Sequence, residues 1–186
     1  LEGGYAVEFA RLGMDSVGIE VRQSNFDRCM YVASKAFLPN LKFIQDDVLN
    51  IKKYGRFDVV FCCGLLYHLD NPREYLKTLS EVCNRVLILD THYATIEEAP
   101  KFKSKLSALD THEGMIGRWY TEYDEGESTA LDEKREASWE NRRSFWPTKS
   151  ELFQALFGAG FSSVTNEYCP RPVHNDDQRA MFVAVK

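Results

Sequence analysis

The sequence lacks the features that mark several large classes of protein. No apolar run approaches the roughly 20 residues that a membrane-spanning helix needs, and the start has no basic segment followed by a long apolar one. We therefore expect a cytoplasmic protein without a membrane-spanning segment. Basic residues are not in excess either, since the formal net charge is -5. This balance argues against a broad phosphate-binding surface, but it is compatible with a local basic groove.

The cysteines and histidines also lack the spacing of metal ligands. The five cysteines are an odd number without any C-x-x-C pair, and the four histidines are scattered. Cys62 and Cys63 lie inside the apolar run FDVVFCCG. Buried, reduced thiols explain this pattern better than disulfides or zinc. We predict no metal site.

Strand and helix patterns alternate over the first two-thirds of the chain. A parallel sheet crossed by helices is the architecture that such alternation predicts. The C-terminal part predicts one more helix and two strands that are antiparallel to each other. The predicted strands are 16–21, 41–44, 57–63, 85–89, 161–168 and 181–185, and the first two predicted helices are 5–12 and about 25–37.

Helix start signals are clear at several places. Asn71 is a good N-cap, Pro72 suits the first helical position, and Glu74 completes a capping-box pattern. Thr148 and Glu151 form a second capping box. Ser24 or Asn25 is expected to cap the helix whose apolar face carries Phe26, Cys29, Met30, Ala33 and Phe37.

The segment at about 93–143 breaks the alternation, because it is polar, aromatic and rich in charge. Long insertions in compact domains are commonly lids or mobile loops. We expect a single domain over residues 1–186, with this segment inserted as a partly helical lid or cap. A solvated surface excursion is the alternative for its acidic middle, EYDEGE.

Ligands of open α/β sheets bind at the carboxyl ends of the strands. Glu20 closes the strand SVGIE, and an acidic side chain there can accept both hydroxyl hydrogens of a ribose. Asp46 and Asp47 end the next strand, where a carboxylate can accept from an exocyclic amine. The alternative for one of these two is the capping of a turn. Gly3 and Gly4 permit a close backbone approach to a ligand.

Taken together, LEGGYAVEFARLG, VGIE, FIQDDV and FDVVFCCGLLYHLDNP resemble the class I S-adenosylmethionine-dependent methyltransferases. LLYHL and NRRSFWPTKSELFQALFGAGF are more loosely similar to the tRNA wobble-uridine carboxymethyl-transferring branch of that superfamily. The resemblance implies a Rossmann-like, mostly parallel sheet with helices on both faces and an antiparallel C-terminal strand. Because Leu1 stands inside the first motif, the chain is expected to be truncated there and to miss the first strand.

The resemblance also implies S-adenosylmethionine as cofactor and gives roles to its binding residues. Glu20 binds the ribose hydroxyls, Asp47 or its neighbour Asp46 takes the adenine amino group, and Val48 packs on or donates to the ring. The first motif lines the methionine part of the cofactor with Glu2, Gly3 and Gly4. Cys63 and Gly64 approach the methionine moiety and the sulfonium.

Three residues are candidates for catalysis. By the same resemblance, Tyr67 and His68 face the transfer site. His68 is the first candidate for a general base, because imidazole titrates near neutrality; hydrogen bonding to its loop or capping of the next helix is the alternative. His92, at the end of the strand RVLIL, is a second candidate with a structural alternative. Tyr67 orients the substrate or packs on the cofactor.

Several functions stay open on this basis. The first is methyl transfer to a small molecule, and the second is tRNA modification, which the acidic charge disfavours. A non-catalytic fragment that keeps the fold is the third, and an NAD dehydrogenase is disfavoured because G-x-G-x-x-G is incomplete. A missing strand also makes strand exchange or a homodimer plausible.

Overall fold

The structure is a computed structural model that describes residues 3–97, 102–127, 137–167 and 178–186. Within these ranges, no helix is both long and apolar enough to cross a membrane. The described residues form two compact units, one within residues 3–53 and the other from residue 54 onward. Each unit is described by itself.

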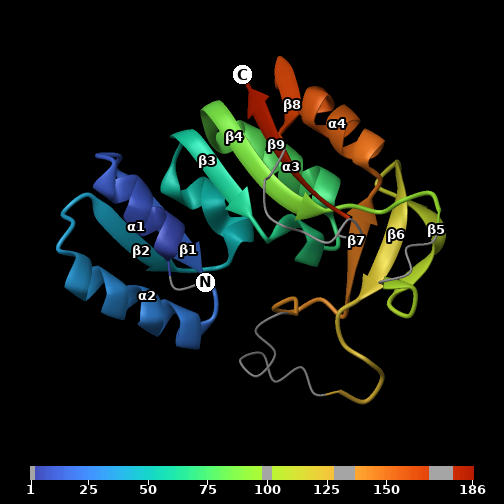
Figure 1. Ribbon diagram of the computed structural model, residues 1–186, viewed down its shortest axis with the longest axis horizontal. Helices are drawn as coiled ribbons and strands as arrows, with labels where there is room; N and C mark the ends of the chain where they lie inside the picture. The colour runs from blue at the N-terminus through green and yellow to red at the C-terminus, as the bar shows by residue number, and fades with distance from the viewer. Residues whose placement is uncertain (1–2, 98–101, 128–136, 168–177) are drawn as a thin grey trace. The chain divides into compact units, whose positions relative to one another are not determined.

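Unit 1 contains two helices packed on a two-stranded parallel sheet (Figure 1). Strands β1 (Ser16–Glu20) and β2 (Leu41–Gln45) pair in register from Ser16–Leu41 to Glu20–Gln45. Val7 of helix α1 (Gly4–Arg11) and Cys29 of helix α2 (Gln23–Ala36) meet Phe43 of β2 in one apolar cluster. A short 3-10 helix, η1 (Val48–Tyr54), follows the sheet.

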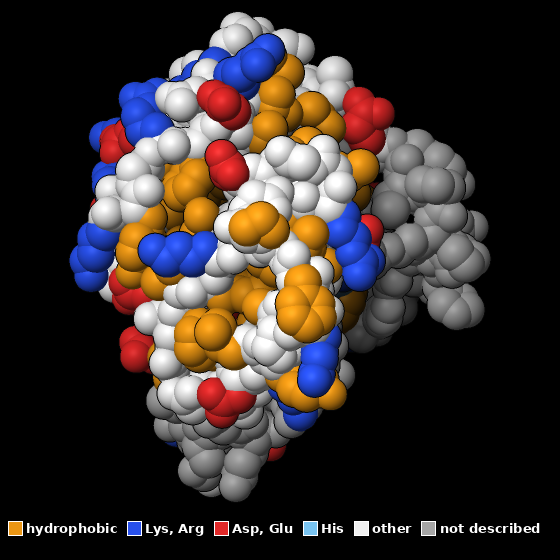
Figure 2. Space-filling view, turned by 90° about the vertical axis from the view of Figure 1, so that its left-hand side faces the viewer, with side chains coloured by type: hydrophobic (Ala, Val, Ile, Leu, Met, Phe, Trp, Pro, Cys, Tyr) orange, Lys and Arg blue, Asp and Glu red, His pale blue; other side chains and the backbone are white. Residues whose placement is uncertain are grey.

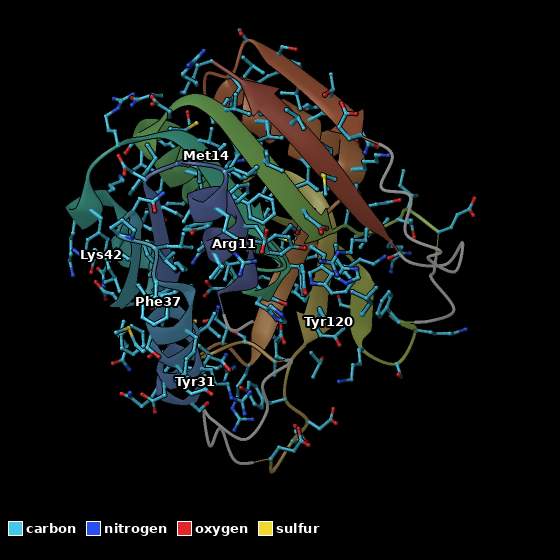
Figure 3. All side chains as sticks on the ribbon, turned by 60° about the vertical axis from the view of Figure 1, so that its left-hand side comes forward. Arg11, Met14, Tyr31, Phe37, Lys42 and Tyr120 are labelled. Carbon is cyan, nitrogen blue, oxygen red and sulfur yellow. The ribbon has the colours of Figure 1, made fainter. Side chains whose placement is uncertain are left out.

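Helix α2 corrects two predictions. It begins at Gln23 with Arg22 as its N-cap, so neither Ser24 nor Asn25 caps it. Phe37 and Met30 do not lie on a buried apolar face: Phe37 is the C-cap, with a positive φ of 52°, and is 85% exposed, and Met30 is 46% exposed. Met14 and Tyr31, two further apolar residues of this unit, are also exposed (Figure 3). Figure 2 shows apolar side chains, in orange, among charged ones on the face that it displays.

Unit 2 is built on a four-stranded sheet of order β3-β4-β9-β8. Strands β3 (Phe57–Cys63) and β4 (Cys83–His92) are parallel, whereas β9 (Arg179–Val185) runs antiparallel to both β4 and β8 (Ser163–Glu167). Helices α3 (Pro72–Val82) and α4 (Lys149–Gly158) pack against this sheet and each other. The predicted antiparallel C-terminal strand is confirmed, and the predicted strand end at Tyr168 lies outside the described residues.

A second sheet in unit 2 replaces the expected partly helical insertion. It is antiparallel, with β5 (Leu106–His112), β6 (Met115–Thr121) and β7 (Arg143–Pro147) in that order. The turn between β5 and β6 explains the difference, because Glu113 and Gly114 both have positive φ, 50° and 71°. Two such residues suit the tight hairpin turns that join twisted antiparallel strands. The helical prediction for the described part of this segment was therefore wrong.

The helix starts are partly as predicted. Thr148 caps α4 by accepting from the Glu151 N–H, and Asn71 and Pro72 occupy the expected first positions of α3. The Asn71 side chain, however, does not cap α3. Instead the Glu113 carboxylate accepts from the backbone N–H groups of residues 73 and 74, at 2.8 and 3.1 Å, so the cap comes from the β5–β6 turn.

The described cysteines behave as predicted. Cys29, Cys62 and Cys83 are buried, Cys63 is half-buried, and none of these four forms a disulfide; Cys169 lies outside the described residues. Burial raises the pKa of the Cys62 thiol to about 12, so this group stays protonated.

Candidate active site

The carboxyl ends of β3 and β4 meet the start of β9 in unit 2. Cys63 pairs with Asp90 in the parallel ladder, and His92 pairs with Arg179 in the antiparallel one. Residues that are far apart in the sequence therefore gather at one edge of the sheet. The short 3-10 helix η2 (Leu66–His68) follows β3 and adds Tyr67 and His68 to this group.

Asp90 is the polar centre of this edge and is only 4% exposed. Its carboxylate accepts from Nε and Nη2 of Arg179, at 2.6 and 3.1 Å, and from the Cys63 thiol at 3.2 Å. Its backbone carbonyl accepts from the Gly64 N–H at 2.9 Å. Gly64 has a φ of +71°, a left-handed conformation that favours glycine. Asp90 thus holds both predicted methionine-side residues in place.

Aromatic rings line the same edge. The Trp146 ring is stacked between His92, with centroids 4.9 Å apart, and Tyr120, at 4.6 Å. Tyr67 meets His92 edge-on at 4.6 Å, and the Arg179 guanidinium lies 5.9 Å from the centroid of the Tyr67 ring. Burial raises the pKa of the Tyr67 phenol and lowers the pKa of His92 to about 4. His92, whose Nδ1 donates to the Gln178 carbonyl at 3.0 Å, is therefore neutral at neutral pH.

His68 has a partner that the sequence did not reveal. Its Nδ1 lies 2.9 Å from Oε1 of Glu122, whose side chain is 1% exposed. Glu122 follows β6 and belongs to the acidic run EYDEGE. One of the two predictions for this run was a solvated surface excursion. Glu122 also accepts from the Ser144 hydroxyl at 2.8 Å and from the Ser138 N–H at 3.0 Å.

The glycine turn in unit 1 is shaped by one aromatic ring. Gly3 is the N-cap of α1 with a φ of 69°, and a Cβ added to it would lie 2.2 Å from the Phe43 ring. A Cβ on Gly18 would lie 2.6 Å from the same ring. Gly4 has no such constraint, and Glu2 lies outside the described residues. Close packing of the first helix onto the sheet therefore requires glycine at residue 3.

The predicted nucleoside residues end β1 and follow β2 in unit 1. Oε1 of Glu20 accepts from the Arg22 N–H at 2.9 Å, and Oε2 accepts from the Asn25 amide at 3.4 Å. Asp46 turns its carboxylate to its own loop, where it accepts from the Asp47 N–H and the Asn50 amide, both at 2.8 Å.

Asp47 and Val48 complete this set. Oδ1 of Asp47 accepts from the Leu49 N–H at 2.8 Å, and Val48 begins η1. Asp47 is therefore less committed to its loop than Asp46, in which one oxygen takes two hydrogen bonds and the other lies 3.8 Å from Lys53 Nζ.

Comparison with curated proteins finds tRNA U34 carboxymethyltransferases. That of Campylobacter lari is 43% identical over 49 residues, which cover 25% of this chain and 17% of that protein. That of Wolinella succinogenes is 33% identical over 114 residues, which cover 52% of this chain and 41% of that protein. The chain thus spans less than half the length of these relatives.

A solved structure resembles the whole chain. The N-terminal domain of EvdMO1 with SAH bound has a TM-score of 0.78 and 26% sequence identity, over 100% of this chain and 71% of that one. The family described as "Methyltransferase domain" matches residues 2–140. The resemblance to class I S-adenosylmethionine-dependent methyltransferases, and with it the α/β Rossmann-like fold, is confirmed: the chain belongs to the methyltransferase domain family.

Proposed function

We propose that this chain binds S-adenosylmethionine and transfers its methyl group to a hydroxyl group of a small molecule. The observation that carries the proposal is His68, held by a buried carboxylate beside the strand ends of unit 2. A hydroxyl acceptor must lose a proton during transfer, and imidazole is the side chain best suited to take it near neutral pH.

The residues of unit 1 suit the nucleoside part of the cofactor. Each oxygen of the Glu20 carboxylate takes one hydrogen bond from the protein, which leaves acceptor capacity for ribose hydroxyls. Asp47 is the better candidate for the adenine amino group, because Asp46 is engaged by its own loop. Val48 would pack beside the ring. Gly3 and Gly4 supply the glycine turn.

The residues of unit 2 suit the methionine part and the acceptor. Gly64, fixed by Asp90, presents backbone without a side chain beside Cys63. Bound S-adenosylmethionine supplies a methyl group on a positively charged sulfur, so the protein has mainly to align and desolvate the reactants. Tyr67 would orient the acceptor, and His68 would hold its proton. His92 is the weaker base, because burial lowers its pKa to about 4.

A small-molecule acceptor is supported by one neighbour and by charge. The N-terminal domain of EvdMO1 was also crystallised in the presence of SAH and D-fucose. The net charge of -5 disfavours a nucleic-acid surface. Incubation with methyl-tritiated S-adenosylmethionine and a panel of hydroxylated small molecules, D-fucose first, should label at least one of them. No labelling despite cofactor binding would overturn the acceptor class.

A second function is favoured by the curated relatives. The relative from Wolinella succinogenes, 33% identical over 114 residues, supports transfer to the wobble uridine of tRNA. Bulk tRNA belongs in the same assay, followed by nucleoside analysis. It is tested a second time with the sulfonium donor whose methyl group is carboxylated, because S-adenosylmethionine alone supplies a methyl group and no carboxyl. Labelled tRNA together with unlabelled small molecules would replace the first proposal. If calorimetry detects binding of neither S-adenosylmethionine nor S-adenosylhomocysteine, a non-catalytic chain that keeps the fold is favoured instead of either enzyme.

A further inference from the structure

We infer that Glu122 is a positioning residue that fixes the proton of His68 on Nδ1 and so leaves Nε2 as the proton acceptor. The role of Nε2 in transfer rests on the proposed function, whereas the position of the proton does not. The inference starts from the 2.9 Å contact between His68 Nδ1 and Glu122 Oε1.

The surroundings of Glu122 are those of a carboxylate anion. Its side chain is 1% exposed, and all three described neighbours supply hydrogen atoms: the Ser144 hydroxyl, the Ser138 N–H and the His68 ring. A buried carboxylate is stabilised by such donors.

The tautomer of His68 follows from this arrangement. A carboxylate accepts hydrogen bonds only, so His68 Nδ1 must carry the hydrogen that points at Oε1. In a neutral imidazole the other nitrogen is then unprotonated. No hydrogen bond to Nε2 is found among the described residues of the chain, which leaves Nε2 as the ring nitrogen that would take the proton of an acceptor hydroxyl.

The second oxygen of Glu122 determines how the amide of Glu122→Gln would be oriented. Oε2 accepts from the backbone N–H of Ser138, which can only donate. In Glu122→Gln the amide oxygen must therefore occupy the Oε2 position, and the NH2 group must occupy the Oε1 position. The NH2 group would donate to His68 Nδ1, so the ring proton would move to Nε2. The Ser144 hydroxyl can accept as well as donate, and it adapts to either state.

The experiment is a long-range proton–nitrogen correlation spectrum of the full, nitrogen-15-labelled chain, which reports which nitrogen of each imidazole is protonated. The chain has four histidines, and His68→Asn identifies the His68 signals by their loss. No cofactor or acceptor is needed, so the outcome is independent of whether methyl transfer is detected.

We expect His68 in the wild type to carry its proton on Nδ1, and in Glu122→Gln on Nε2. Ser144→Ala is the matched control, because it removes a hydrogen bond to the same Oε1 atom but keeps the carboxylate; it should leave the tautomer unchanged. A wild-type ring protonated on Nε2 would overturn the inference, even if Glu122→Gln does not fold. An unchanged tautomer in folded Glu122→Gln would overturn it too.

Discussion

Arg179 and Asp90 form an ion pair with two hydrogen bonds between the neighbouring strands β9 and β4. Arg179 Nε lies 2.6 Å from Asp90 Oδ1, and Nη2 lies 3.1 Å from Oδ2. The pair forms because Arg179 faces His92 in the ladder, two residues beyond Asp90 and on the same side of the sheet. Hydrogen bonding to Asp90 raises the pKa of Arg179, and the pair holds the strand end that carries Gly64.

Breaking this pair should destabilise unit 2 strongly. Asp90→Ala leaves a partly buried guanidinium without its partner, and we expect the free energy of unfolding to fall by about 3 kcal/mol. Urea unfolding followed by circular dichroism measures this. Glu8→Ala is the control, since its pair with Arg11 is exposed and should be worth less than about 1 kcal/mol. Equal losses in the two variants would contradict the role of Asp90.

The glycine turn offers two neighbouring substitutions with opposite expected effects. Gly3→Ala places a Cβ 2.2 Å from the Phe43 ring at a positive φ, so it should destabilise unit 1 by about 2 kcal/mol or more. Gly4→Ala meets nothing within 4 Å inside a helix and should be neutral or stabilise by up to about 1 kcal/mol. Thermal unfolding compares the two. A tolerated Gly3→Ala would argue against this packing.

His92 makes stability depend on pH. Its pKa is lowered to about 4 in the folded chain, so protonation favours the unfolded state as the pH falls from about 6.5 toward about 4. Its contribution is fully present above that window. When the pH is lowered from about 7 to about 5, the free energy of unfolding measured in urea should fall by roughly 2 kcal/mol more in the wild type than in His92→Gln. If the free energy of unfolding depends on pH identically in both proteins, the pKa of His92 is not lowered in the folded chain.

Glu20 should matter for the cofactor. Glu20→Ala removes the acceptor proposed for the ribose hydroxyls, and calorimetry should find S-adenosylmethionine binding weakened at least about tenfold, or about 1.4 kcal/mol. Asp15→Ala, an exposed acidic residue just before β1, is the control and should bind as the wild type does. Unchanged affinity in a folded Glu20→Ala would refute the ribose assignment.

His68 should matter for turnover more than for cofactor affinity. Once an acceptor is labelled, His68→Ala should lower kcat on the order of 100-fold or more, because proton removal from the hydroxyl loses its base. S-adenosylmethionine affinity should change little. His112→Ala, a histidine on β5 that contacts the Asn71 side chain, controls for the loss of an imidazole. Full activity of His68→Ala would remove it as the base.

Much of the fold follows from local patterns in the sequence. The β-rich run that ends at Glu20 and the apolar run from Phe57 to Cys63 are strands, because period and composition report burial directly. Thr148 caps its helix because a cap is made by residues three apart. The insertion was misread because its hairpin turn, Glu113-Gly114, looks like ordinary polar sequence.

The amino-acid sequence by itself determined which residues stand at the strand ends, since each strand end is a local event. Only the tertiary structure decided their partners. Glu122 reaches His68 across 54 positions, Arg179 reaches Asp90 across 89, and Glu113 caps a helix that begins 41 positions earlier. Such pairs depend on strand order and on the antiparallel return of β9. A glutamate in an acidic run has the same sequence signature whether it is solvated or, like Glu122, buried against a histidine.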